Sequence, residues 1–203
     1  MAFNRFENIE QVITKYPLKI HKGKFLPAVE KPLPSCFVED LNFLMDMKSI
    51  DENESFYDES LIFPFLREAW KGHRKLKLWI RRPLVYDDEL SGELDYLLSS
   101  LPEDNEVIDK LINKPTLAVT KVKTEDFTRG WAQCLAEMIA CQKINDNPEI
   151  TIYGIVSTGL MWEFCKMEGN TLIKDPMSCF INNPQQLFGN LDFVFAECEK
   201  QLN

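Results

Sequence analysis

Segments with helical and with alternating spacing of apolar residues follow one another along the chain. Apolar side chains recur at roughly helical spacing in residues 7–15 and 37–45, and again after the acidic pair Asp58 and Glu59, as far as Gly72. Residues 74–82 instead alternate long polar and apolar side chains, which is the period of a half-buried strand. The first part of the chain is therefore predicted to be helical and to lead into a sheet.

The rest of the sequence predicts further strands and two more helices. Its β-rich segments span 90–99, 117–123, 151–157 and 160–167, and a tight turn at 168–170 joins the last of these to 171–174 in a hairpin. Helical patterns span 126–143, with Asp126 or Thr128 as the N-cap, and 184–202. This order of elements predicts an α/β fold in which helices flank both faces of a mixed sheet.

Length and composition fit one domain with a sizeable core, because the 203 residues are 45% hydrophobic. We expect residues 1–55 to form an N-terminal extension that packs on a core domain of residues 56–203. Six cysteines without a CxxC pair, and only two histidines, indicate reduced thiols and no structural zinc. A charged start and the lack of a long apolar segment predict a cytoplasmic protein that does not bind membranes.

Basic residues gather in one stretch although the chain as a whole is acidic. Its 32 Asp and Glu against 23 Lys and Arg give a formal net charge of −9, which opposes general binding to a phosphate backbone. Lys71, Arg74, Lys75 and Lys77, close to two tryptophans, are a candidate local site for DNA. The alternative is that they cover the outer face of an edge strand, where basic residues discourage pairing with other sheets.

Asp95 and two lysines are the first candidates for chemistry. Asp95 lies inside an apolar strand, where an ionised carboxylate is costly unless it is paired or bound to a metal. The next strand ends in Lys121-Val122-Lys123, which places both ammonium groups on one face. A carboxylate beside a carboxylate-x-Lys triplet would suit metal-dependent phosphodiester hydrolysis, since acids hold Mg²⁺ and the lysine steadies developing charge. The sequence contains only part of this set of residues.

Four passages resemble, in order, motifs of the PD-(D/E)XK nuclease-like superfamily, in particular its small bacterial and cyanobacterial members. Those motifs are G-x-x-D-Y on a strand, P-x-L-x-V-x-E-A-K, G-x-A-Q-x-x-A-E-M on a helix, and Y-G-I-V-T-x-G-x-x-W-x-F. The corresponding passages here are GELDY (92–96), PTLAVTKVK (115–123), GWAQCLAEM (130–138) and YGIVSTGLMWEF (153–164). The resemblance covers about half of the chain and implies a restriction-endonuclease-like fold and Mg²⁺-dependent cleavage of DNA.

The resemblance also implies a role for each matched residue. Asp95 corresponds to the metal-binding Asp, Lys123 to the catalytic Lys, Gln133 to an orienting Gln on the following helix, and Glu59 to a metal-binding Glu on the preceding helix. Lys121 departs from the pattern, because it stands where the family has the acid of its E-x-K triplet. An ammonium about 5 Å from a divalent ion opposes its binding by several kcal/mol at an effective dielectric of ~20.

Glu137 offers one way to replace the missing acid. It follows Gln133 by four residues, so both lie on one face of the predicted helix, from which Glu137 would reach a metal at Asp95. Glu93, two residues before Asp95 on the same strand face, is a second candidate. The ordinary interpretation is that both acids face solvent, and that Asp95 and Lys123 form a structural ion pair.

Two functions follow from these observations. In the first, the protein is a binding or scaffold module that kept a nuclease fold and lost catalysis, with another protein as its partner, because Lys121 replaces the acid. In the second, it is an active Mg²⁺-dependent DNA endonuclease or exonuclease that uses Asp95, Lys123 and Gln133, and it binds DNA through the local basic residues. The net charge of −9 favours the first.

Overall fold

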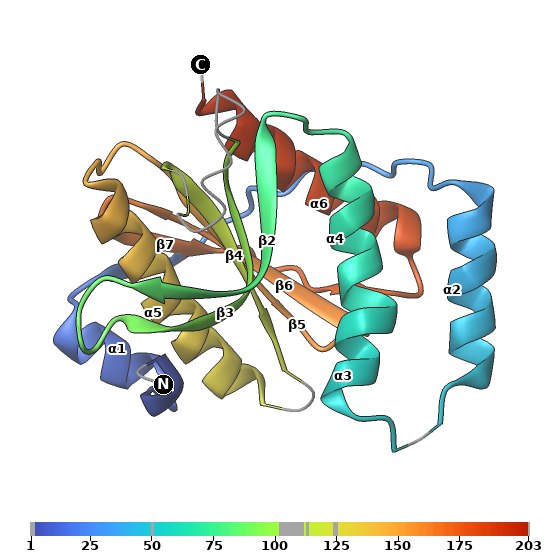
Figure 1. Ribbon diagram of the computed structural model, residues 1–203, viewed down its shortest axis with the longest axis horizontal. Coiled ribbons are helices and arrows are strands. Elements are labelled where there is room, and N and C mark those ends of the chain that lie inside the picture. The colour runs from blue at the N-terminus through green and yellow to red at the C-terminus, as the bar shows by residue number, and fades with distance from the viewer. Residues whose placement is uncertain (1–2, 50, 102–111, 113, 124–125, 203) are drawn as a thin grey trace.

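The computed structural model describes residues 3–49, 51–101, 112, 114–123 and 126–202, and the strands in these residues form one mixed sheet (Figure 1). The strands are β1 (Lys19–Lys22), β2 (Leu76–Val85), β3 (Ser91–Ser100), β4 (Thr116–Val122), β5 (Ile152–Ser157), β6 (Met161–Glu168), β7 (Thr171–Lys174) and β8 (Cys179–Phe180). Their order is β1-β7-β6-β5-β4-β3-β2, and β8 pairs with the start of β6. The β4–β5 and β1–β7 pairs are parallel and the other neighbours antiparallel.

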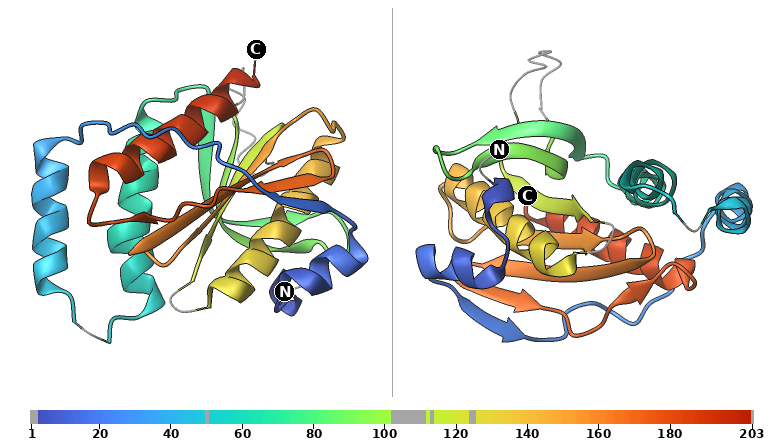
Figure 2. Two further views of the ribbon diagram at one scale, coloured as in Figure 1. Left: turned by 180° about the vertical axis from the view of Figure 1, so that it is seen from behind. Right: turned by 90° about the horizontal axis from the view of Figure 1, so that it is seen from below.

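Helices cover both faces of this sheet, which confirms the predicted α/β architecture (Figure 2). One face carries α1 (Ile9–Lys15) and α5 (Phe127–Asn145), and the other carries α4 (Phe63–Lys71) and α6 (Pro184–Lys200). The helix α2 (Ser35–Met47) lies outside α4, on the side away from the sheet. Three short helical turns complete the description, η1 (Phe3–Arg5), α3 (Glu54–Phe56) and η2 (Tyr57–Ile62), of which α3 and η2 run directly into α4.

Two apolar cores hold the layers together. One joins the sheet to α2, α4 and α6 and contains Phe65 and Trp162, whereas the other joins it to η1, α1 and α5 and contains Phe3 and Met138. The strands β4 and β5 are buried along their whole length, as expected for central strands that are covered on both faces. Any polar side chain on these two strands therefore needs a partner inside the protein.

Two glycines let α5 pack closely against the sheet. At Gly154 of β5, an added Cβ would lie 2.5 Å from Met138 Sδ, and at Gly130 of α5 it would lie 2.9 Å from Val156 Cγ1. Both distances are shorter than real Cβ contacts, so these positions have room only for glycine. The close approach buries α5 on all sides from residue 130 to 141, including its polar side chains.

The predicted strands and helices are confirmed within a few residues, with one exception at a helix start. The helix predicted to begin at Asp58 begins instead at Glu54, because the Asn53 side chain accepts a hydrogen bond from the Phe56 backbone N–H and caps it. The short strands β1 and β8 are not predicted, and β1 is exposed at all four positions, so it carries no apolar alternation. Residues 1–55 thus supply α1, α2 and one strand of the sheet.

None of the described helices is both long and apolar enough to cross a membrane. All six cysteines are free, and all but Cys36 are buried.

Candidate functional site

Asp95 lies where β3 separates from β4. The two strands pair through Tyr96 and Thr120, and beyond this pair the Asp95 carboxylate accepts a hydrogen bond from the backbone N–H of Val122, with Oδ2 and N 2.9 Å apart. The carboxylate thereby satisfies a backbone donor that β3 no longer pairs. Its side chain is 30% exposed, so Asp95 lies at the boundary between the buried part of the sheet and the surface.

The ammonium of Lys121 lies between two carboxylates. Its Nζ is 3.1 Å from Asp95 Oδ2 on β3 and 3.2 Å from Glu137 Oε1 on α5. The Lys121 side chain is 5% exposed and that of Glu137 is fully buried, so the solvated position considered for Glu137 is wrong. We call Asp95, Lys121 and Glu137 the Lys121 cluster, and Gln133 is buried one turn before Glu137 on α5.

Burial and attraction act in opposite directions on the buried members of this cluster. Burial raises the pKa of Glu137 to about 7, and the neighbouring Lys121 ammonium limits the rise. Burial alone would lower the pKa of Lys121, but Glu137 and Asp95 outweigh it and hold that pKa above its usual range. Lys121 is therefore a cation near neutral pH, and the cluster titrates there through Glu137.

Several buried side-chain oxygen atoms on α5 have no hydrogen bond with the described residues. Both carboxylate oxygens of Glu137 and the Oε1 of Gln133 are buried and accept no hydrogen bond from the part of the chain that the structure describes. The Glu137 carboxylate thus has Lys121, at ion-pair distance, as its charged partner. Glu93, the other acid considered for this site, is exposed on β3.

Lys123 lies beside the cluster without joining it. Its backbone N–H donates to the carbonyl of Ser157, and its Cγ would be 3.1 Å from a Cβ added to Gly130. Its ammonium forms no hydrogen bond or ion pair with the described residues, whereas Asp95 pairs with Lys121. The ion pair expected between Asp95 and Lys123 is therefore wrong, because the partner of Asp95 is Lys121.

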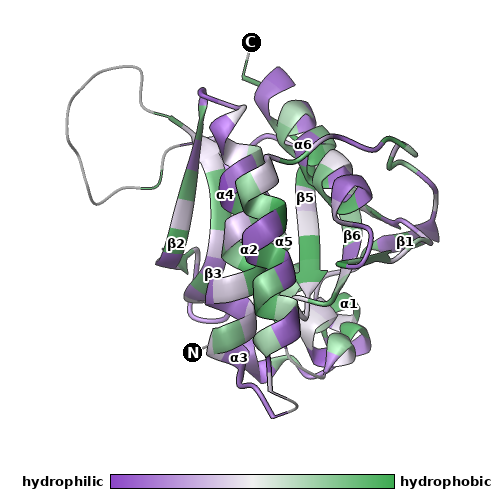
Figure 3. Ribbon diagram, turned by 90° about the vertical axis from the view of Figure 1, so that its right-hand side faces the viewer, coloured by the Kyte–Doolittle hydropathy of each residue, from purple (hydrophilic) through white to green (hydrophobic). Residues whose placement is uncertain are grey.

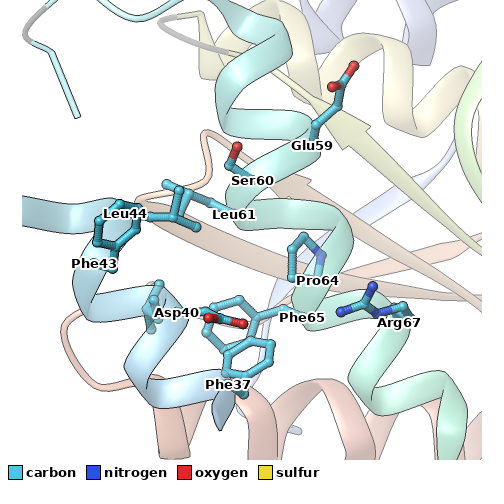
Figure 4. A pocket seen from close by; sticks show the side chains of 11 residues that line it. Phe37, Asp40, Phe43, Leu44, Glu59, Ser60, Leu61, Pro64, Phe65 and Arg67 are labelled. Carbon is cyan, nitrogen blue, oxygen red and sulfur yellow. The ribbon is translucent and has the colours of Figure 1, made fainter. Parts of the chain in front are cut away.

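The structure places Asp58, and not Glu59, against the sheet. Asp58 is buried in the π-helical turn η2, where it accepts hydrogen bonds from the Tyr96 hydroxyl and from Arg81 Nη2, the latter at 2.9 Å. Arg81 has φ +48°, a left-handed conformation that is strained for a side chain of this size. Glu59 is exposed and lines a groove between α2 and α4 (Figure 4), so it is not brought to Asp95.

The predicted DNA-binding residues lie at the end of α4 and at the start of β2, and they are Lys71, Arg74, Lys75 and Lys77. Lys71 pairs with Glu68 one helical turn earlier at 2.5 Å, and the Lys77 ammonium lies 5.6 and 5.4 Å from the ring centroids of Trp70 and Trp79. The strand β2 is the last strand at one side of the sheet. This is the edge position required by the alternative interpretation, in which these basic residues cover an edge strand and discourage its pairing with other sheets.

Sequence reasoning missed a second buried polar contact, around His73. Its Nδ1 is 3.1 Å from Glu199 Oε2 and its Nε2 is 3.3 Å from Asp192 Oδ1, both on α6. Burial would raise the pKa of Glu199, but hydrogen bonds from the Lys75 backbone and from His73 outweigh it and lower that pKa. The contact ties the start of β2 to α6, and its partners are more than a hundred residues apart in the chain, so no local signal reveals it.

Magnesium, which the family resemblance implies, does not fit this arrangement of residues. Lys121 Nζ lies within 3.2 Å of an oxygen of both Asp95 and Glu137. At an effective dielectric of about 20, a divalent ion about 4 Å from that ammonium meets a repulsion of roughly 8 kcal/mol. No three His, Cys, Asp or Glu side chains gather into a metal-binding group in the described ranges. Of the predicted ligands, only Asp95 and Glu137 share the cluster, and a cation of the chain lies between them.

A comparison of the sequence with models of known protein families finds no match, and a comparison with curated proteins likewise finds none.

Proposed function

We propose that this protein is a binding module with a restriction-endonuclease-like fold that does not catalyse phosphodiester hydrolysis. The position of the Lys121 ammonium, at ion-pair distance from both Asp95 and Glu137, carries this proposal. A metal-dependent nuclease needs free carboxylate oxygens to hold its ion. Here both carboxylates already lie at ion-pair distance from a positive charge that belongs to the chain.

The burial of the cluster makes this arrangement costly to undo. If Lys121 left its place for a metal ion, Glu137 would remain as a fully buried carboxylate without its cation. Breaking a buried pair in this way costs on the order of 3–5 kcal/mol. A weakly held Mg²⁺ ion does not return that free energy, since it usually keeps several of its waters.

One observation favours the alternative, an active Mg²⁺-dependent DNA nuclease. The two oxygens of Glu137 and the Oε1 of Gln133 are buried acceptors without hydrogen-bond partners among the described residues. Such oxygens are the atoms that a hard cation binds. In this alternative Lys123, whose ammonium has no ion-pair partner in the described part of the chain, is the catalytic lysine.

A plasmid-nicking assay with Mg²⁺ and Mn²⁺ separates the two functions. The proposal predicts that the wild type nicks no faster than Asp95→Ala, which also controls for contaminating nucleases. Nicking by the wild type that is lost in both Asp95→Ala and Lys123→Ala would overturn the proposal and establish the alternative.

A further inference from the structure

An apolar groove runs between α2 and the helix formed by η2 and α4. It has a volume of about 300 Å³ and lies on the side of α4 that faces away from the sheet (Figure 4). Its apolar walls are formed from the two helices by Phe37, Leu41, Leu44, Leu61, Pro64 and Phe65.

Apolar surface continues from the groove onto the outside of α2. Phe43, which lines the groove, is 60% exposed, and Met47, one turn further along α2, is 68% exposed. In the view of Figure 3, α2 lies in front of α4 and carries apolar and hydrophilic residues side by side. Large exposed apolar side chains gathered beside a groove are typical of a protein-binding surface, and methionine adapts readily to different partners.

The segment that contains α2, α3 and the start of η2 carries most of the net negative charge of the protein. Residues 35–60 contain eight acidic side chains and a single lysine, against a net charge of −9 for the whole chain. Asp40 and Glu59 line the groove itself, and Glu39, Asp46 and Glu54 are exposed nearby on α2 and α3. We call these five acids, on the elements that form and adjoin the groove, the acidic rim.

The acids on these elements differ from those of the Lys121 cluster because they form no ion pair with the described residues. None of Glu39, Asp40, Asp46, Glu54 and Glu59 forms an ion pair with a residue that the structure describes. Of the described lining residues, Arg67 alone is basic, and its guanidinium lies over the ring of Phe63, 5.8 Å from the ring centroid. The rim therefore offers unpaired negative charge around an apolar surface.

We propose that this groove binds a basic amphipathic helix of a partner protein. Apolar side chains of that helix, spaced at i, i+4 and i+7, fill the groove and pack on Phe43, while its Lys and Arg residues pair with the acidic rim. This inference rests on the proposed binding function, since it names the class of partner for that function.

The charge of the rim selects this occupant over others. DNA, RNA and anionic membranes are repelled by unpaired carboxylates, and a second copy of this chain carries the same negative charge. A helix also fits the geometry, since a third helix laid between two roughly antiparallel ones buries an apolar stripe against both (Figure 1). A helical segment that is apolar on one face and basic on the other matches both properties.

The test uses a fluorescent designed helix of about 18 residues, with Leu at i, i+4, i+7 and i+11 and Lys at most other positions, followed by fluorescence anisotropy with the full chain. We expect saturable binding that weakens as the salt concentration rises. Two control peptides accompany it, one with Glu in place of every Lys, and one with the same composition in an order that removes the apolar stripe. Equal binding of either control, or no binding of the basic peptide, would overturn the proposal.

Matched variants locate the site. Phe43→Ser and the double variant Asp40→Lys/Glu59→Lys are expected to weaken peptide binding by about tenfold or more, as loss of a central contact does. Phe180→Ser, which removes an aromatic side chain that is 51% exposed on β8, and Glu149→Lys at the α5–β5 turn are expected to leave it unchanged. If the variants in the groove and the controls lose affinity equally, the groove is not the site.

The two proposals fail in different experiments. Nicking activity that depends on Asp95 would overturn the proposed function and leave the groove as an interface of an enzyme. Absence of peptide binding in a protein that does not nick DNA would overturn only the groove inference.

Discussion

The Lys121 cluster and the α2–α4 groove place acidic side chains in opposite situations. In the cluster, Glu137 is fully buried and a lysine of the same chain lies at ion-pair distance from it and from Asp95. In the groove, Asp40 and Glu59 are exposed and have no ion-pair partner among the described residues. The acids of the cluster thus have a cation of their own chain as partner, whereas the acids of the groove gain one only when another molecule brings positive charge.

This difference predicts which property of the protein, stability or binding, each region affects. Charges that are paired and buried have large effects on stability when one partner is removed, because the other is left without compensation. Exposed charges are screened by water and salt and contribute little to folding, but they steer and select a partner. We therefore expect changes in the cluster to alter stability and changes in the groove to alter binding.

The largest effect is expected from Lys121→Met, which keeps an unbranched side chain of similar length and removes the charge. It should destabilise the fold by about 3–5 kcal/mol, because Glu137 and Asp95 lose their cation. Urea denaturation at neutral pH measures this effect. Lys123→Met is the matched control and should change the free energy of unfolding by no more than about 1 kcal/mol.

The double variant Lys121→Met/Glu137→Leu sharpens this prediction. Removing both buried charges should recover much of the lost stability, since apolar side chains of similar size often replace a buried ion pair without cost. If Lys121→Met is as stable as the wild type, the buried pair does not hold the cluster together.

The second prediction concerns the pH dependence of stability. Between pH 4.5 and 7, the unfolded chain has released the Glu137 proton while the folded protein, with a pKa of about 7, still retains it. The folded state then binds more protons, so its stability falls as the pH rises through this window, by an amount on the order of 3 kcal/mol. Above pH 7 this contribution no longer changes with pH.

Glu137→Gln removes this titration and provides the comparison. Denaturation of the two proteins from pH 4.5 to 8 should show a stability difference that changes through the window and levels off above it. A constant difference across the whole range would mean that the Glu137 pKa is not raised in the folded protein.

A third prediction uses Lys121→Glu, which restores an acid where the family motif has one. The variant gathers three carboxylates and should be less stable than the wild type without divalent ions. Added Mg²⁺ should stabilise it by about 1–3 kcal/mol, because an ion that binds only the folded state raises stability by mass action. Thermal melts with and without Mg²⁺ measure this, and an equal response of the wild type would contradict the account.

The smallest stability effect is expected in the groove. Phe43→Ser removes a side chain that is 60% exposed, so it should change the free energy of unfolding by only about 0.5–1 kcal/mol while it weakens peptide binding. Loss of several kcal/mol in this variant would mean that α2 is a structural part of the core, and that its exposed residues are not reserved for a partner.

Much of the fold could be predicted from the sequence because most of its elements are periodic. The alternation in 74–82 and the helical spacing in 184–202 both lead to elements that the structure contains, β2 and α6. The short strand β1 could not be predicted, since its stability comes from pairing with β7 and not from its own pattern.

The candidate site was predicted only in part, because the burial of Glu137 and of Asp58 depends on local packing that the sequence pattern does not reveal. Glu137 is buried because Gly130 and Gly154 let α5 approach the sheet on a side that the helical period assigns to solvent. Glu59, which the family resemblance implied as a metal ligand, is exposed, and its neighbour Asp58 in the π-helical turn η2 is the acid that is buried against the sheet.

The most direct test of the central claim is a calorimetric titration of the wild type and Asp95→Ala with Mg²⁺, at a pH above the Glu137 pKa of about 7, where its carboxylate is ionised. The account predicts the same small heats of dilution for both proteins, because Lys121 already occupies the position between the carboxylates. Saturable Mg²⁺ binding by the wild type that Asp95→Ala abolishes would contradict it.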